Sequence, residues 1–200
     1  MMLCLVTDRR LRPPVEQARE AADAGIDLIH VRERDLDAAE LSALVMRILD
    51  ATRGSGTRVV VNDRVDVAIV CGAAGVHLRG DSIPAARVRT MTGPGFLIGC
   101  SVRGPVDALR VAGDADYLVA GTVFPTTSKS GMRDHLCLAG LSSIVATVPV
   151  PVLAIGGMST ARAGEIAAAG AAGLAVIGLF ADPHRPIKDV VRQLRDKLSP

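Results

Sequence analysis

The sequence predicts an α/β protein whose single domain, residues 1–200, folds as a (βα)8 barrel of the TIM type. Short apolar runs recur along the chain, and both alternating faces of each run are apolar, as in parallel strands that are covered on both sides. Ala-rich segments with helical spacing lie between many of these runs, which is typical of alternating βα units. Eight such runs favour a closed barrel over an open doubly wound sheet, which usually has fewer strands and carries GxGxxG after its first strand.

The expected strands are rich in Val, Ile and Leu, and they cover residues 3–6, 27–31, 58–61, 75–78, 96–98, 117–120, 150–155 and 173–177. The expected helices have apolar residues at helical spacing, and they cover residues 15–24, 38–52, 64–70, 83–91, 105–111, 141–147 and 160–169. Four helices reach a glycine just before the next strand, at Gly25, Gly72, Gly113 and Gly170. Glycine suits the left-handed position that closes a helix, and such short connections fit compact βα units.

The composition excludes several classes of protein. Because 49% of the residues are hydrophobic, a disordered chain is not expected, and the aromatic content of 2% argues against base-stacking surfaces for single-stranded nucleic acid. The formal charge of +2 and the lack of a long basic block argue against nonspecific binding to nucleic acid or to a membrane. Any recognition of an anion is therefore expected to be local.

The cysteines and the start of the chain bear on its location. The four cysteines, at positions 4, 71, 100 and 137, are scattered and form no CxxC motif, so we expect reduced thiols in a cytoplasmic protein. The first expected strand leaves no room for a signal peptide, and the longest apolar tract, 167–181, is interrupted by glycine and short for a membrane span. The sequence leaves the oligomeric state open and allows a homo-oligomer.

Basic side chains follow the second expected strand, at the barrel end where active sites form. Period-two alternation places His30, Arg32 and Arg34 on one face, and arginine can clamp a phosphate through two hydrogen bonds. The alternative is a salt-bridged surface in which these cations pair with neighbouring carboxylates such as Glu33 and Asp35.

Oxygen-bearing side chains follow the third, fourth and fifth expected strands. Asp63, which comes after Asn62, and Asp81 could supply hard oxygen ligands to one Mg²⁺ that bridges substrate phosphates. The alternative is that these residues cap helices, which is the commoner role of Asn and Asp at such positions. Ser101 is open to the same two interpretations, as a helix cap or a phosphate donor. His77 is expected to pack or to form local hydrogen bonds, because no second His lies at metal-ligand spacing.

The later strand ends carry residues that are typical of phosphate sites. The stretch VFPTTSKSG follows the sixth strand, and its polar residues include Thr126, Ser128 and Lys129. Gly156 and Gly157 follow the seventh strand, and Ile177 and Gly178 end the eighth. Glycine permits close approach to the backbone, and a phosphate site after strands seven and eight is a recurring feature of this barrel. The alternative is an ordinary tight turn.

The order and spacing of several motifs resemble the thiamine phosphate synthase/TenI superfamily over nearly the whole chain. The motifs are HVRERD, VNDRVDVAIVCGAAGVHL, IGCSV, ADYLVAGTVFPTTSK, PVLAIGGM and AGLAVIG. The resemblance implies a transferase of thiamine biosynthesis that joins 4-amino-2-methyl-5-hydroxymethylpyrimidine pyrophosphate to thiazole phosphate, giving thiamine monophosphate and pyrophosphate. It also implies a dissociative mechanism in which Mg²⁺ and cationic side chains stabilise the departing pyrophosphate.

The resemblance implies a role for each candidate residue. The implied ligands of pyrophosphate or the reacting centre are Arg32, Arg34, Ser101 and Lys129. The implied contacts of the pyrimidine are His30 and Asn62, and the implied metal ligands are Asp63 and, through a shifted loop, Asp81. The implied site for the thiazole phosphate consists of Thr126, Ser128 and the backbone at Gly156, Gly157, Ile177 and Gly178.

Five positions depart from the pattern of the superfamily, and the first is Cys4, which stands where an aromatic residue is common in the first strand. His30 and Arg34 stand where synthases usually have Gln and Lys, and Ser82 stands where the second magnesium Asp falls by simple spacing. Thr122 stands where a TenI-type thiazole tautomerase has its His. The alternatives to a synthase are therefore a TenI-like tautomerase, favoured by the weakened metal site, and a noncatalytic regulator that binds thiazole phosphate.

Overall fold

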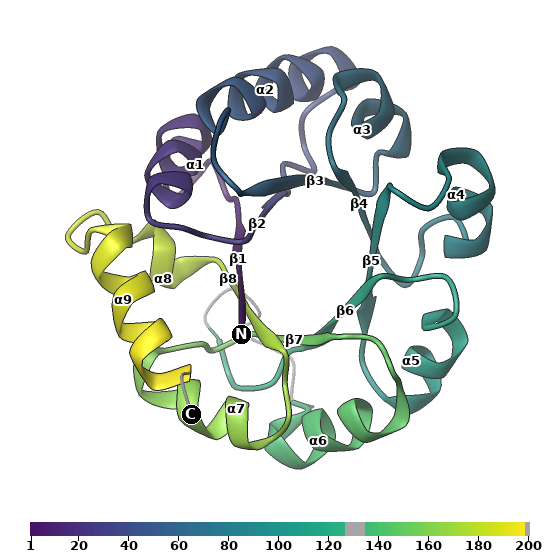
Figure 1. Cartoon of the computed structure of the whole chain (residues 1–200), viewed down its shortest axis with the longest axis vertical. Coiled ribbons are helices and arrows are strands. Elements are labelled where there is room, and N and C mark those ends of the chain that lie inside the picture. Colours follow the sequence, from purple (N-terminus) through teal and green to yellow (C-terminus); the bar gives the residue numbers. More distant parts are fainter. Residues whose placement is uncertain (127–134, 199–200) are drawn as a thin grey trace.

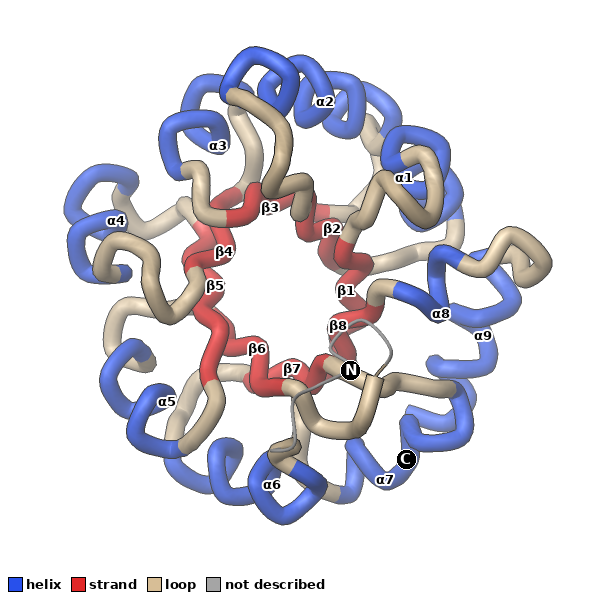
Figure 2. Tube along the Cα trace, turned by 180° about the vertical axis from the view of Figure 1, so that it is seen from behind, coloured by secondary structure: helices blue, strands red, loops and turns tan. Residues whose placement is uncertain are grey.

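Eight parallel strands close into a barrel in the computed structural model, which describes residues 1–126 and 135–198. The strands are β1 (Met2–Val6), β2 (Leu28–Val31), β3 (Arg58–Asn62), β4 (Gly75–Leu78), β5 (Leu97–Val102), β6 (Tyr117–Gly121), β7 (Val152–Ile155) and β8 (Gly173–Val176). Each strand pairs with the next along the chain, and β8 pairs with β1 to close the barrel. Figure 1 looks into the resulting ring, and Figure 2 shows from behind that the helices surround it. The predicted (βα)8 barrel is confirmed.

The helices follow the strands in alternation. They are α1 (Pro14–Asp23), α2 (Ala38–Ala51), α3 (Val65–Cys71), α4 (Ala85–Thr92), α5 (Pro105–Val111), α6 (Cys137–Thr147), the 3₁₀ turn η2 (Thr160–Arg162), α7 (Ala163–Ala168), α8 (Gly178–Ala181) and α9 (Ile187–Leu198). α2 begins with a capping box, in which the Asp37 carboxylate accepts from the Glu40 N–H and the Glu40 carboxylate accepts from the Asp37 N–H. Within the described ranges, no helix is long and apolar enough to cross a membrane.

Three elements differ from the sequence-based prediction. The helices α8 and α9 were not predicted, because the segment after β8 lacks the Ala-rich composition by which the other helices were recognised; its buried positions Ile187, Val190 and Leu194 nevertheless recur at helical spacing. β5 extends to Val102, so Ser101 lies within a strand and not after it. The extension was missed because a serine in an inward position of a strand resembles the start of a loop.

The alternation of side chains along the strands separates two apolar regions. Outward side chains such as Ile29 and Leu118 pack against the helices, whereas inward side chains such as Leu28 and Val60 fill the lumen. The last inward positions of four neighbouring strands, β2 to β5, are polar instead. These positions are His30, Asn62, His77 and Ser101. The apolar lumen therefore ends in a polar layer on one side of the barrel mouth.

Candidate active site

The polar layer is joined by hydrogen bonds across the strands. His30 Nε2 lies 3.2 Å from Asn62 Oδ1, and His77 Nε2 lies 2.9 Å from Ser101 Oγ. The two imidazole rings are in contact, with centroids 4.5 Å apart. His30, Asn62 and His77 are buried, and Ser101 is exposed at the mouth. As predicted, His77 packs in the interior, but its hydrogen-bond partner Ser101 is distant in sequence and not local.

Burial keeps both histidines neutral near physiological pH. It lowers the pKa of His77 from 6.5 to about 4, since the charged ring loses its hydration. Burial also lowers the pKa of His30 well below 6.5, and the neighbouring His77 and Arg32 lower it further. The polar layer therefore offers neutral hydrogen-bonding groups, while the positive charge at the mouth comes from arginines.

A groove of about 380 Å³ lies beside this layer and is lined almost entirely by charged side chains. Its lining consists of Asp8, Arg10, Arg32, Glu33, Arg34 and Asp35. The three carboxylates of the lining are engaged by Arg9 and Arg10 of the β1–α1 loop. Arg10 donates to both oxygens of Asp8, at 2.8 and 2.7 Å, and thereby lowers the pKa of that carboxyl group. Arg9 pairs with Asp35 at 2.7 Å.

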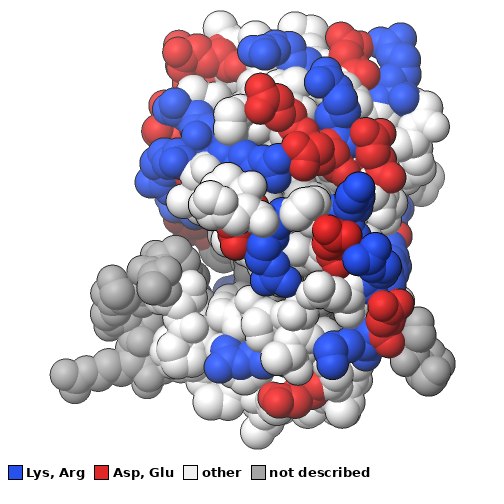
Figure 3. Space-filling view, turned by 90° about the vertical axis from the view of Figure 1, so that its left-hand side faces the viewer, with Lys and Arg blue, Asp and Glu red and all other residues white. Residues whose placement is uncertain are grey.

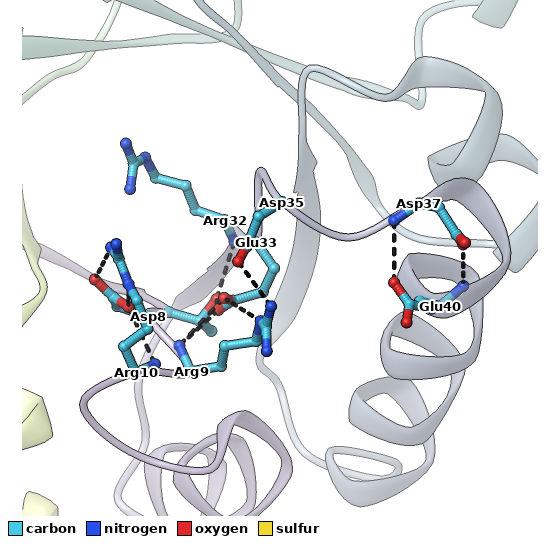
Figure 4. A network of polar contacts seen from close by, with 9 residues as sticks. Asp8, Arg9, Arg10, Arg32, Glu33, Asp35, Asp37 and Glu40 are labelled. Carbon is cyan, nitrogen blue, oxygen red and sulfur yellow. Dashed lines mark hydrogen bonds and ion pairs between the residues drawn. The ribbon is translucent and has the colours of Figure 1, made fainter.

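Glu33 is held on the side of the β1–α1 loop. Its carboxylate accepts hydrogen bonds from Thr7 Oγ1 at 2.6 Å and from the Arg9 N–H at 3.1 Å, and the Thr7 hydroxyl oxygen accepts from the Arg32 N–H at 2.9 Å. Figure 4 shows the consequence: the Arg32 side chain points away from this cluster. Successive side chains after β2 point in opposite directions. Glu33 therefore stabilises the β1–α1 loop, whereas the Arg32 side chain lies at the mouth.

Arg32 and Arg34 are cations that no described carboxylate neutralises directly. Among the described residues, neither guanidinium takes part in a hydrogen bond or an ion pair, so the predicted alternative of a salt-bridged surface holds for Arg9 and Arg10 instead. Burial lowers the pKa of Arg32, and repulsion from Arg34 lowers it further, yet arginine stays charged because its ordinary pKa lies far above neutral pH. Two adjacent cations without a described partner suit an anion with more than one negative charge.

Asp63 has a backbone conformation that is rare for a residue with a side chain. Its φ is +64°, in the left-handed region, and its N–H donates to the His77 carbonyl at 2.9 Å. The carboxylate accepts from the Ser82 hydroxyl, and Arg79 Nη1 lies 3.6 Å from it. Within the described residues no side chain caps α3 or α4, so the capping interpretation of Asn62, Asp63 and Asp81 is wrong.

The oxygen atoms around Asp63 match the ligand preference of Mg²⁺ in part. Asp63, Ser82 and Asp81 come from the adjacent ends of β3 and β4, and Mg²⁺ is usually bound by one or two carboxylates together with substrate phosphates. Arg79 pairs with Asp81 as well as with Asp63, so its guanidinium lies between the two carboxylates. Asp63 therefore fits the metal as a single carboxylate, whereas a shared ligand role for Asp81 requires Arg79 to leave. The described residues contain no cluster of three or more His, Cys, Asp or Glu side chains suited to a metal.

The glycines after β7 lie against the start of the loop after β6. Gly156 and Gly157 both have positive φ, +101° and +66°, and a Cβ on Gly157 would come within 2.6 Å of the Pro125 carbonyl. The Phe124 N–H donates to the Gly156 carbonyl at 3.1 Å. These contacts bring the segment that ends at Thr126 beside the half-buried glycines of the β7 turn. Because β7 and β8 pair in parallel, Ile177 and Gly178 follow at the neighbouring strand end.

The remaining predicted residues of this region, Ser128 and Lys129, lie outside the described residues. Sequence reasoning missed Arg162, which donates to the Gly157 carbonyl at 2.8 Å and stacks over the Phe124 ring, and so holds the glycine turn in place. It also missed Arg79 as the partner of both aspartates, and Tyr117 as a partner of His77. The signal for Arg79 was available, since it lies between the two candidate aspartates in the sequence.

The face of the molecule that Figure 3 displays has no cluster of basic side chains comparable to Arg32 and Arg34 among its described residues. On the face of α8, α9 and α1, Lys and Arg side chains lie interspersed with Asp and Glu. Such a mixture agrees with the near-neutral charge of +2 and does not attract a large polyanion. On this face, the described basic side chains thus form no cluster like the arginine pair at the mouth.

A (βα)8 barrel whose strand ends carry an oriented aspartate, a glycine turn and arginines without a described ion-pair partner has the features of an enzyme barrel that takes an anionic ligand. Comparison with known proteins specifies the family. The family model for thiamine monophosphate synthase matches residues 3–180, and the chain belongs to this family. The thiamine-phosphate synthase of Methanoculleus marisnigri is 38% identical over 98% of this chain and 95% of its own, and that of Chlorobium phaeovibrioides is 34% identical with the same coverage.

Solved structures agree with this assignment. The thiamine phosphate pyrophosphorylase from Pyrococcus furiosus is 34% identical, with a TM-score of 0.88 and coverage of 98% of this chain and 95% of that chain. The 3-hexulose-6-phosphate synthase from Salmonella typhimurium is 16% identical, with a TM-score of 0.73 over 99% of this chain and 98% of that chain, and at that identity the likeness concerns the fold alone.

Proposed function

We propose that the protein is a transferase of the thiamine phosphate synthase type. It would join 4-amino-2-methyl-5-hydroxymethylpyrimidine pyrophosphate to thiazole phosphate. The bond between the pyrimidine methylene carbon and the pyrophosphate oxygen breaks, and a bond from that carbon to the thiazole nitrogen forms. The products are thiamine monophosphate and pyrophosphate. The observation that carries the proposal is the pair Arg32 and Arg34, whose guanidinium groups are engaged by no described carboxylate.

The departing pyrophosphate accumulates charge as the carbon–oxygen bond breaks, so stabilisation of that charge is the main catalytic task. Arg32 and Arg34 are proposed to stabilise this charge, with the Ser101 hydroxyl as a hydrogen-bond donor from the polar layer. Lys129, which follows in the loop after β6, is assigned to the same anion by sequence resemblance. In this proposal no side chain attacks the substrate, which agrees with the neutral, buried state of His30 and His77.

The two organic substrates are assigned to opposite sides of the mouth. Asn62 and His30 are proposed to bind the pyrimidine, since the carbonyl oxygen of Asn62 is engaged by His30 and its amide N–H groups are left for a ring nitrogen. Thr126 and Ser128, with the backbone at Gly156, Gly157, Ile177 and Gly178, are proposed to bind the thiazole phosphate. The positive φ values of the two β7 glycines support this assignment, because such turns expose backbone N–H groups to anions.

Mg²⁺ is proposed as the cofactor. When bound, it would neutralise charge on the leaving pyrophosphate. Asp63 is the residue assigned to hold it, because its left-handed backbone directs the carboxylate to the end of β4. Asp81 is a second candidate only in a state in which its ion pair with Arg79 is broken.

The proposal is tested by incubating the purified protein with both substrates and Mg²⁺ and measuring thiamine monophosphate and pyrophosphate in equal amounts. Isomerisation of the thiazole phosphate without the pyrimidine would instead identify a tautomerase, although the buried Thr122 offers no acid or base at the position of the tautomerase His. Tight binding of thiazole phosphate without any turnover would identify a noncatalytic regulator.

A cytoplasmic location and homo-oligomer formation remain proposals as well. The free state of all four cysteines supports a reducing compartment. Sedimentation analysis of the purified protein would measure the oligomeric state directly.

Replacing Arg79 by glutamine is expected to tighten the binding of a divalent metal. The substitution removes the cation that pairs with the half-buried Asp63 and the exposed Asp81, and ion pairs that remain in contact with solvent have small effects. We therefore expect the dissociation constant for Mn²⁺, measured by electron paramagnetic resonance without substrate, to fall by about 2- to 5-fold. Arg87→Gln, an exposed charge change on α4, serves as the control and should leave the constant unchanged. Equal constants for Arg79→Gln and the wild type would show that Arg79 does not compete with the metal.

A further inference from the structure

The barrel lumen contains a row of hydrogen bonds that ends at the exposed Ser101. Tyr117 OH lies 3.2 Å from His77 Nδ1, and His77 Nε2 lies 2.9 Å from Ser101 Oγ. The three side chains come from β6, β4 and β5. Tyr117 and His77 are buried, with 3% and 2% of their surface exposed, so the row leads from the closed interior to the mouth.

Gly99 makes this row geometrically possible. The strand register aligns His77 with Gly99 and Gly99 with Tyr117, so the glycine lies between the two rings on the intervening strand. A Cβ at this position would come within 2.4 Å of the Tyr117 hydroxyl and 2.6 Å of His77 Nδ1. Because Gly99 has no side chain, the Tyr117 hydroxyl and His77 Nδ1 can approach each other over this position.

The hydrogen-bond donors of the row can be assigned by satisfying the buried groups. The Tyr117 hydroxyl must donate its proton, and among the described residues its one hydrogen-bond partner is His77 Nδ1. His77 Nδ1 must therefore be the acceptor. A neutral imidazole has one N–H, which then lies on Nε2 and is donated to Ser101 Oγ. The reverse assignment would bury an unpaired tyrosine O–H, which is costly.

We propose that Tyr117 and His77 are positioning residues that fix the direction of the Ser101 hydroxyl group. Because Ser101 Oγ accepts from His77, its own proton is free to be donated outward to an anion at the mouth. Without this constraint, Ser101 could donate to His77 and present its lone pairs to the ligand, which would repel an anion. Burial supports the assignment, since it raises the pKa of Tyr117 well above 10 and lowers that of His77 to about 4, so that both stay in the required protonation states.

This inference rests on the proposed function only in naming pyrophosphate as the anion. The first test needs no ligand. In protein labelled with ¹⁵N-histidine, long-range proton–nitrogen correlation spectra report which ring nitrogen carries the proton, and the His77→Gln spectrum identifies the His77 signals. We expect a protonated Nε2 and an unprotonated Nδ1 in the wild type, and a shift toward the other tautomer in Tyr117→Phe. A protonated Nδ1 in the wild type would overturn the proposal.

The second test is a double-mutant cycle on the binding of inorganic pyrophosphate, measured by calorimetry. Tyr117→Phe keeps the buried ring and should weaken binding on the order of 3- to 10-fold, through loss of one oriented donor. In the Ser101→Ala background, the same change should have no further effect, because the hydroxyl that it orients is gone. Equal effects in both backgrounds would show that Tyr117 has only a structural role and would overturn the inference. If both tests give the expected results but the wild-type protein shows no synthase turnover, the proposed function is overturned and the inference about Ser101 stands.

Discussion

Replacing Arg32 by glutamine is expected to lower kcat/KM for thiamine monophosphate formation on the order of 10²–10³-fold, the typical cost of losing one preorganised group that stabilises leaving-group charge. Glutamine keeps hydrogen-bonding capacity and most of the side-chain length, so the loss reports the positive charge. The backbone of the segment should persist, because the Arg32 N–H is held by Thr7 and the adjacent Glu33 by Thr7 and Arg9. Steady-state kinetics with both substrates give the measurement.

Arg47→Gln provides the matched control for this experiment. It removes the same charge from the exposed surface of α2, away from the barrel mouth, and should leave kcat/KM within about twofold of the wild type. Arg32→Gln should lower kcat/KM for the pyrimidine pyrophosphate strongly. It should change the dissociation constant of thiazole phosphate alone much less. A variant with wild-type turnover would mean that Arg32 is not a ligand of pyrophosphate.

The free energy of unfolding is expected to fall as the pH drops below 6.5, because the lumen holds His77 in its neutral form. Above the ordinary pKa of 6.5, His77 is neutral in both the folded and the unfolded state, and it contributes no pH dependence. Between pH 6.5 and about 4, the unfolded chain binds a proton at His77 that the folded barrel excludes. His77 alone should therefore lower the free energy of unfolding by about 2 kcal/mol between pH 6.5 and pH 5. His30, whose pKa is lowered in the same way, adds to this slope.

Urea unfolding of the metal-free protein at several values between about pH 5 and pH 7.5 measures this slope. Carboxylates with lowered pKa, such as Asp8 and Asp66, lose their contribution only as the pH falls through and below 3.8, so they affect this window little. His77→Gln should flatten the slope, whereas the control His184→Gln, at an exposed position, should not change it. A slope that is the same in the wild type and in His77→Gln would show that the ring is protonated in the folded barrel.

The overall architecture could be predicted because it depends on periodicity. Strands that are covered on both sides need apolar residues on both faces, and the eight runs with this property closed into the barrel as expected. The boundary of β5 could not be predicted in this way. Ser101 has a polar side chain in an inward position, and its partner His77 is distant in sequence. The C-terminal helix α9 was missed because it relies on four well-spaced apolar residues and not on alanine content.

The sequence predicted which charged residues lie at the strand ends, but it could not predict which of them form ion pairs with one another. A segment that alternates Arg, Glu and Arg could form a phosphate clamp or a salt-bridged surface, and the choice depends on where Glu33 goes. In the structure, Glu33 binds Thr7 and Arg9, which belong to another βα loop. Arg32 and Arg34 therefore have no described ion-pair partner. The pairing of Asp63 and Asp81 with Arg79 depends in the same way on how two strand ends are brought together.

By itself, the sequence determined the barrel, the family resemblance and the set of polar residues at the strand ends, because these follow from local periodicity and from motif order along the chain. Only the tertiary structure decided which arginines stay free, that Arg79 lies between two candidate metal ligands, and that Tyr117, His77 and Ser101 form one row across Gly99. The physical reason is that charge neutralisation and hydrogen-bond direction depend on contacts between different strands. Strand register and barrel closure create those contacts, and no local pattern contains them.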